Sequence, residues 1–407
     1  MQTLKELEKG YFINEIVLYI LLVPFFFPKG FGEYFPVYYN LYRTVLFVAT
    51  VAILIGFIQH IGKGILRFKR SMIFMILYHI SLFLITMFLQ MGITEGIQKI
   101  FIAPALCIVC ADAIKKNGYR FFKVISNILV VDFTLNILVF NEFLFQEYFL
   151  INNHVMFLGH VQVASQIGLL AVFIGKVLKD VYKQNTKGNI LIFLSIINMV
   201  YSQTLASFIS CILLGVGFFL IKHCRSNLLL DNPILSFFFL VLTNISVLYL
   251  TMRMNGSYFL YGYDISLSGR MFIWDKAMEL INGHWLLGYG AYGVLIKVFW
   301  SEWTSHPEGA NYAHNEIMQL LLDGGIILVC IFYIMLFYYL SDMKKAENIV
   351  IKRVATLIFC IFLSLSIVES ISDQYFFFIY LSIIGNLPIL SEYNNFRTTN
   401  GKRISYV

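Results

Sequence analysis

His314 and Asn315 stand together where a polar segment runs into a strongly apolar one, in GANYAHNEIMQLLLDGGIILVC at 309–330. An imidazole that titrates near neutral pH can accept a proton from a hydroxyl group. Arg270 lies upstream in the same polar segment, and its guanidinium offers permanently charged, planar donors that suit a departing diphosphate. These residues predict transfer of a group from a diphosphate. The competing interpretation is that His314 and Asn315 only form a polar cap on the helix that follows.

The elements that must position these residues are membrane helices. Charged residues make up 13% of the chain, against about 25% in soluble domains, and apolar runs long enough to cross a bilayer recur throughout. The fold class predicted is therefore an all-α polytopic membrane protein with about twelve transmembrane helices. We expect these helices at 12–28, 41–61, 72–93, 97–114, 124–141, 159–175, 189–202, 204–221, 232–251, 316–340, 354–369 and 375–391.

The distribution of basic residues predicts the orientation. With both termini in the cytoplasm, most lysines and arginines fall in the inner segments, as the positive-inside rule requires. The net charge of +7 is thereby explained without a nucleic-acid partner. No segment reads as a removable signal peptide. The predicted organisation is helices 1–9 within 1–251, a large outer loop at 252–315, helices 10–12 within 316–391, and an inner tail at 392–407.

The outer loop at 252–315 differs in composition from the other connections. It contains all four tryptophans of the chain, Trp274, Trp285, Trp300 and Trp303. Loops of this length are usually functional or disordered, and the aromatic content argues against disorder. We expect Trp274 and Trp303 to bind sugar rings, although an aromatic belt at the headgroups explains them equally well. Of the two, Trp274 suits anchoring better.

A short amphipathic helix is predicted in the first half of this loop. Ser266 or Ser268 can cap it, and Arg270 lies in its first turn. One stripe would face the protein or the membrane; its members are Ile273, Trp274, Ala277, Leu280 and Ile281. The Gly288, Gly290 and Gly293 that follow spell GxGxxG, but no strand–turn–helix unit frames them. We interpret them as a flexible turn rather than a dinucleotide site.

Two patterns that suggest metal binding are weak or missing. The CIVC pair at 107–110 lies inside an apolar helix with no second pair nearby, which argues against a zinc or redox site. The outer segments show no DxD pair to hold a divalent cation. Arginines would then replace the metal, and no cofactor is predicted.

The loop resembles that of the O-antigen ligase/polymerase family, membrane glycosyltransferases that consume undecaprenyl-diphosphate-linked glycans on the outer face. The resemblance rests on SGRMFIWDKAMELINGHWLLGYGAYG followed by AHNEIMQLLLDGGIIL. The family pattern comprises an Arg, a Trp four residues on, a Gly-x-Gly turn, His-Asn at a helix start, and a later Gly. Here these are Arg270, Trp274, Gly288 with Gly290, His314 with Asn315, and Gly325.

The resemblance implies that His314 is the catalytic residue and Arg270 a diphosphate ligand, with Asn315 beside them in the substrate site. Two family arginines have no counterpart here: SQTLASF at 202–208 and FLGHVQVASQ at 157–166 both lack Arg. The second cationic contact with substrate is therefore expected from Arg43 or Arg253.

The function expected is that of a surface-polysaccharide polymerase in the bacterial plasma membrane. It would move a growing O-antigen or capsule glycan from undecaprenyl diphosphate onto a new lipid-linked repeat unit. A ligase that transfers finished glycan to a lipid or protein shares this mechanism and stays open. A transporter or flippase is the rival from another class, but it predicts duplicated halves that the sequence lacks. Besides the lipid bilayer and the lipid-linked glycan, a flippase and a chain-length regulator are candidate partners.

Overall fold

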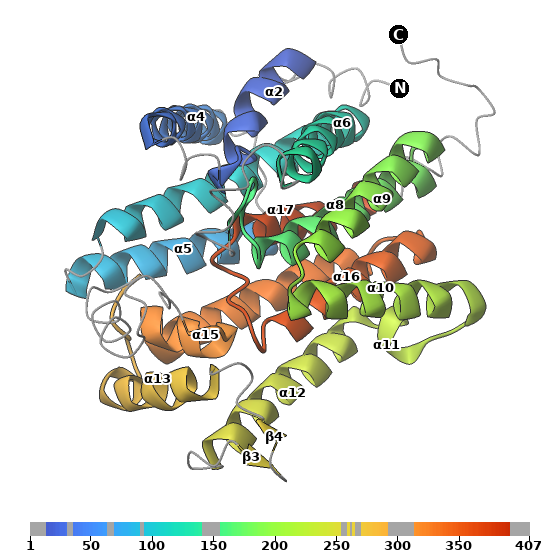
Figure 1. Ribbon diagram of the computed structural model, residues 1–407. Coiled ribbons are helices and arrows are strands. Elements are labelled where there is room, and N and C mark those ends of the chain that lie inside the picture. Colours follow the sequence, from blue (N-terminus) through green and yellow to red (C-terminus); the bar gives the residue numbers. More distant parts are fainter. Residues whose placement is uncertain are drawn as a thin grey trace.

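A computed structural model describes residues 14–30, 36–62, 69–89, 93–140, 155–253, 259–260, 263–264, 270–291 and 313–390. These residues form a bundle of helices with two short antiparallel hairpins at its margin (Figure 1). The first half of the bundle comprises α2 (Glu15–Leu22), η1 (Val23–Phe25), α4 (Pro36–Gly62), α5 (Arg70–Leu89), α6 (Ile93–Phe140), α8 (Val163–Asp180), α9 (Asn185–Tyr201) and α10 (Leu205–His223). The second half comprises α11 (Leu228–Asp231), α12 (Pro233–Arg253), α13 (Arg270–His284), α15 (Glu316–Lys344), α16 (Ile349–Leu365) and α17 (Tyr375–Gly385).

The hairpins are β1 (Val155–Met156) with β2 (Gly159–His160), and β3 (Phe259–Leu260) with β4 (Tyr263–Asp264). Val155 pairs with His160 in the first hairpin, and Phe259 pairs with Asp264 in the second. Each strand is two residues long, so the fold class remains all-α.

The structure bears out an all-α membrane protein. In the described residues, six helical stretches are long and apolar enough to cross a membrane: Val37–Gln59, Arg70–Leu89, Ile100–Leu138, Leu205–His223, Pro233–Thr251 and Glu316–Lys344. Glu15–Phe25 and Tyr375–Gly385 are apolar but shorter. A helix occupies each segment where the sequence predicts one, but a count of twelve separate spans remains a prediction.

Two pairs of consecutive predicted helices are separated by short breaks in the structure. The expected helices at 97–114 and 124–141 both lie in α6, which consists of two helices that meet at the non-helical backbone of Asn117 (φ −154°, ψ 85°). The apolar run from 189 to 221 is also two helices, because α9 ends at Tyr201 and α10 begins at Leu205. Thr204 caps α10 by accepting a hydrogen bond from the Ser207 amide, which explains the break at YSQT.

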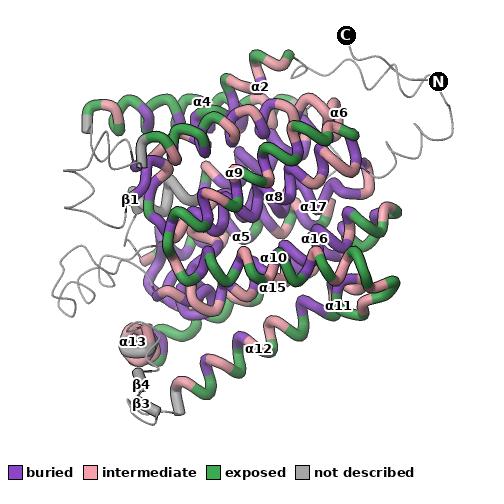
Figure 2. The backbone as a smooth tube through the Cα atoms, turned by 45° about the vertical axis from the view of Figure 1, so that its right-hand side comes forward, coloured by how far each residue is buried: buried purple, intermediate pink, exposed green. Residues whose placement is uncertain are grey.

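The core lies around α8 and α17, which are buried on all sides. Every residue of α17 is buried, and α8 is buried from Ala164 through Gly175. A helix that is apolar all round belongs in the interior of a bundle. The outer helices α4 and α12 expose much of their surface, as Figure 2 shows in green, and their exposed residues include Leu41, Phe47, Phe239 and Leu242. This distribution suits helices that face lipid.

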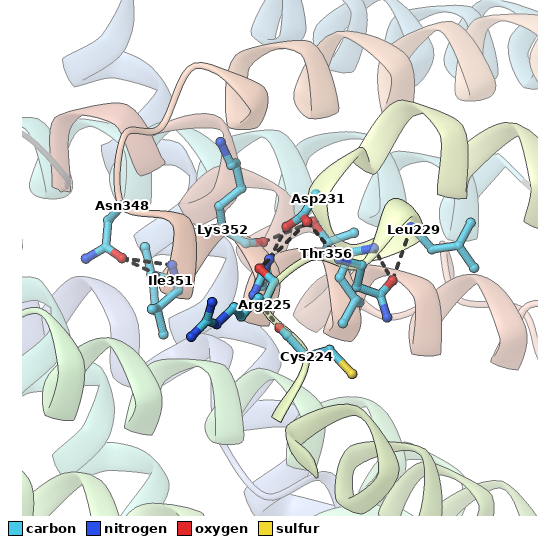
Figure 3. Close-up of polar contacts among 12 residues, drawn as sticks. Cys224, Arg225, Leu229, Asp231, Asn348, Ile351, Lys352 and Thr356 are labelled. Carbon is cyan, nitrogen blue, oxygen red and sulfur yellow. Dashed lines mark hydrogen bonds and ion pairs between the residues drawn. The ribbon is translucent and has the colours of Figure 1, made fainter. Parts of the chain in front are cut away.

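The connection around α11 is held by Arg353 of α16, and Figure 3 labels its partners Cys224, Arg225 and Asp231. Arg353 contacts both carboxylate oxygens of Asp231, at 2.5 and 2.9 Å, and donates to the carbonyls of Cys224 and Arg225 at 3.1 and 2.7 Å. Asn227 caps α11, and its own amide donates to Asp231. Hydrogen bonding from Arg353 holds the pKa of the Asp231 carboxyl below its usual value. The cluster fastens the turn between α10 and α12 to α16.

Replacement of Arg353 by Met is expected to lower the free energy of unfolding by about 2 kcal/mol, because two backbone carbonyls and a carboxylate lose their donor. Thermal unfolding in detergent measures the change. Lys222→Met is the matched control, since Lys222 is an exposed cation in the same segment. Because the pKa of Asp231 is lowered in the folded state, the stabilisation is full above its unfolded pKa and is lost as pH falls through the folded pKa. An equal melting temperature for both variants would contradict this role.

Candidate functional site

The elements that carry the candidate residues gather at one end of the bundle. Helix α13 lies at the end opposite α11 in both views (Figures 1 and 2), and Figure 2 shows β1 on that same side. Figure 2 shows α13 nearly end-on, while α4, α10 and α12 run across the picture. Helix α13 therefore crosses the direction of the bundle helices, as expected for a helix that lies along a membrane surface.

The start of α15 is built around the buried side chain of Asn315. Its Oδ1 accepts a hydrogen bond from the Met318 amide at 3.1 Å, and its Nδ2 donates to the Ile367 carbonyl at 2.9 Å. The next amide, that of Glu316, donates to the Ser366 carbonyl at 2.9 Å. Asn315 thus caps α15 and ties it to the turn after α16. Its side chain is fully buried, which favours capping over contact with substrate.

His314 immediately precedes this cap and has a left-handed backbone, with φ +48°. Such a conformation is uncommon outside glycine and costs on the order of 1–3 kcal/mol unless its surroundings impose it. The His314 Nδ1 atom lies 3.6 Å from Oε2 of Glu369, and the imidazole retains a small exposed area. The cap at Asn315 therefore directs the imidazole toward Glu369 at the mouth of α15.

Glu369 also holds Arg270. The guanidinium Nη2 of Arg270 donates to Oε1 of Glu369 at 2.8 Å. The carboxylate is 4% exposed, the arginine side chain 19% and the imidazole 13%. Residues from α13, from the start of α15 and from the segment after α16 therefore meet at one buried carboxylate. The structure brings together the two residues predicted to do the chemistry.

Glu369 is the site residue that the sequence reasoning missed. It lies in SIVESISD, at the end of the segment predicted as helix 354–369. An acidic residue near the expected outer end of a helix was the feature of the sequence that could have indicated its role. In the structure α16 ends at Leu365, and Glu369 occupies the connection to α17. An acid beside an apolar helix is costly to bury without a partner, and this rule points to the residue once Arg270 is placed near it.

Helix α13 is anchored by the face that the sequence predicts to be apolar. Trp274, Ala277 and Ile281 are buried in a cluster with Met318 and Leu322 of α15. The Trp274 indole donates to the Ala313 carbonyl at 2.9 Å, adjacent to His314. Trp274 is 2% exposed, so its geometry favours anchoring over stacking on a sugar. The indole links the helix that carries Arg270 to the backbone that carries His314.

The Gly-Tyr-Gly turn after α13 docks on a break in α15. Gly324 and Gly325 depart from helical geometry, and Gly325 has φ +62°. The Tyr289 amide donates to the Leu322 carbonyl at 2.6 Å, and the Ile326 amide donates to the Trp285 carbonyl at 2.9 Å. The turn predicted to be flexible is thus held by backbone hydrogen bonds. We call residues 285–290 with 322–326 the glycine clasp.

Three glycines are required by this clasp. Gly288 and Gly290 have φ +64° and +82°. A Cβ at Gly288 would lie 2.4 Å from the Leu322 carbonyl oxygen, and one at Gly325 would lie 2.2 Å from the Leu286 carbonyl. Burial raises the pKa of the Tyr289 phenol, which donates to the Leu280 carbonyl at 3.0 Å. Gly293, the last glycine of the literal motif, lies outside the described residues.

The remaining predicted contacts lie elsewhere or outside the described residues. Arg43 is exposed on α4, and its guanidinium carbon lies 5.7 Å from the ring centre of Tyr39. Arg253 is the last residue of α12, and its side chain is outside the described part of the structure. Trp303 also lies outside the described residues. The roles of all three remain predictions.

Gly325→Ala is expected to destabilise the fold by about 2–4 kcal/mol, because it adds both backbone strain and a clash with Leu286. Activity should fall with it, since the clasp joins the helix of Arg270 to α15. Gly283→Ala is the matched control in α13, where an added Cβ meets nothing within 4 Å. Thermal unfolding and membrane abundance measure both variants. Wild-type behaviour of Gly325→Ala would mean that the clasp holds nothing in place.

Comparison with known proteins identifies part of the chain. Residues 190–333 match a family model described as O-antigen ligase. The matched segment runs from α9 into α15 and includes Arg270, the glycine clasp and His314. A search of curated proteins found no match.

Proposed function

Residues 190–333 match a family model described as O-antigen ligase, and from this premise we propose that the chain polymerises surface polysaccharide. The reaction would transfer a growing glycan from undecaprenyl diphosphate to a new lipid-linked repeat unit, on the outer face of the bacterial plasma membrane. The observation that carries the proposal is the Glu369 carboxylate shared by Arg270 and His314.

The proposed transfer begins at the acceptor sugar. His314 removes the proton from the attacking hydroxyl group through Nε2, because Nδ1 faces Glu369. The hydroxyl oxygen bonds to the anomeric carbon of the donor, and the bond from that carbon to the diphosphate oxygen breaks. The electron pair leaves with undecaprenyl diphosphate. The proton is carried away from His314 afterwards, to water or to the departing diphosphate, which restores the base.

Arg270 and Glu369 have distinct roles in this scheme. Arg270 stabilises the negative charge that develops on the leaving diphosphate, and a guanidinium can do so without a metal ion. Glu369 fixes the orientation of the imidazole and stabilises the imidazolium that forms, as carboxylates do behind catalytic histidines elsewhere. It also holds Arg270 at the same mouth. Glu369 is thus a positioning residue.

His314→Ala is expected to reduce transfer by about 10²–10⁴-fold, the usual contribution of a general base. The measurement is glycan length on gels, from cells that lack the protein and carry wild type or variant at equal membrane abundance. Loss of the ladder with a single repeat unit still attached supports the polymerase. A full ladder from His314→Ala would overturn the proposal.

A ligase is the second candidate, favoured by the description of the matching family model. It uses the same base and cation but a different acceptor. In the same gel experiment, loss of all attached glycan while polymer persists on the lipid carrier would identify a ligase.

Glu369→Gln is expected to lower the transfer rate by about 10-fold or more, up to the roughly 10⁴-fold loss seen when the carboxylate behind a serine-protease histidine becomes an amide. The amide keeps the size of the side chain but cannot stabilise an imidazolium. Glu279→Gln is the matched control, because Glu279 is an exposed acid on α13 that pairs only with Lys276 in the described residues. An initial-rate assay on purified protein compares the two. Equal rates would remove Glu369 from the mechanism.

A further inference from the structure

Two cations lie apart from Arg270 at the same end of the bundle. Lys29 follows η1 and sits against the hairpin β1–β2: its Cβ lies 3.5 Å from where a Cβ on Gly159 would be. The next residue, Gly30, lies directly against the Met156 carbonyl of β1. Arg43 lies in the second turn of α4. Both residues therefore belong to the end of the bundle that the hairpin marks.

Aromatic rings surround these two cations. The Lys29 ammonium lies 4.9 Å from the ring centre of Tyr375, the first residue of α17. The Arg43 guanidinium lies 5.7 Å from the ring centre of Tyr39. Tyr42 joins the two pairs, because its ring centre is 6.2 Å from that of Tyr39 and 4.9 Å from that of Phe27, which lies two residues before Lys29. We call Lys29, Tyr39, Tyr42, Arg43 and Tyr375 the tyrosine cradle.

The cradle differs from the Arg270 site in its charge. Arg270 is already paired with Glu369, whereas in the described part of the chain Lys29 and Arg43 contact aromatic rings and form no ion pair. A pair of cations without carboxylates, lined by phenol groups that can donate hydrogen bonds, suits a phosphate group. Tyr375 follows Glu369 closely along the chain, so the cradle borders the segment that holds the Arg270–His314 pair.

The surface beside the cradle is apolar and exposed. Leu41, Val45 and Val48 of α4 have exposed fractions of 60%, 46% and 60%. They continue from the cradle along a helix long and apolar enough to span a membrane. A phosphate headgroup in the cradle would therefore have room for an attached hydrocarbon chain along α4. The combination fits a lipid phosphate better than a soluble one.

We propose that the tyrosine cradle binds the diphosphate of the second lipid substrate, the acceptor repeat unit, while Arg270 binds the diphosphate of the donor. This inference rests on the proposed polymerase, since that reaction requires two lipid-linked diphosphates at once. Lys29 and Arg43 supply the charge, and Tyr39, Tyr42 and Tyr375 supply the walls. The acceptor diphosphate is thereby held near the start of α17, and the donor diphosphate near Glu369.

Native mass spectrometry of the full-length protein in phosphatidylcholine nanodiscs, with undecaprenyl diphosphate as the probe, tests the cradle directly. Wild type is expected to bind two molecules. The double variant Lys29→Gln/Arg43→Gln should keep only the molecule at Arg270, and Arg270→Gln should keep only the molecule in the cradle. Lys276→Gln is the control, because Lys276 is an outer-loop cation that pairs with Glu279 and should leave both sites intact.

Kinetics then relate the cradle to the reaction. In the double variant the KM for the lipid-linked acceptor should rise about tenfold or more, with the donor KM unchanged. Two bound molecules in the double variant would overturn the cradle. Displacement of the cradle-bound molecule by an equal concentration of phosphatidylglycerol would also overturn it, by showing a general phospholipid site. If cells that lack the protein make polymer as long as that of cells carrying wild type, while the double variant loses one bound diphosphate, the polymerase fails and the lipid site stands.

Discussion

The end of the bundle that carries His314 depends on how α15 begins. A helix that starts inside a membrane protein has amide groups with no partner in the helix, and lipid offers none. Asn315 meets this need with a side chain that caps the helix and also binds the connection after α16. His314 immediately precedes that cap in the chain and has a left-handed backbone. The position of the imidazole is thus a by-product of satisfying backbone amides.

One carboxylate then serves two purposes. Glu369 balances the charge of Arg270 and faces the imidazole of His314, so that a half-buried arginine and a buried acid pair with one another in a region of low dielectric constant. Trp274 adds a second link by binding the carbonyl of Ala313. The glycine clasp adds a third, further along α15. These contacts join α13 both to α15 and to the connection after α16, and this redundancy suits a site whose parts come from distant segments.

Much of the fold could be predicted because hydropathy and charge are local properties. The apolar segments, the break at YSQT and the buried stripe on α13 all follow from residue order. The pairing of Arg270 with His314 was suggested by their shared loop. Glu369 could not be found this way, because its role depends on which segments meet in space. The clasp was misread as flexible for the same reason: glycines that permit a positive φ look alike whether the turn is loose or docked.

The break in α15 has a consequence for how the protein is assembled. At Gly324 and Gly325 the helix gives up hydrogen bonds in the middle of a membrane span, and residues 285–289 restore a donor and an acceptor at that point. These residues precede α15 in the chain, so they leave the ribosome first. When α15 enters the membrane, the groups that complete it have already been made. The order of synthesis therefore agrees with the order in which the hydrogen bonds are needed.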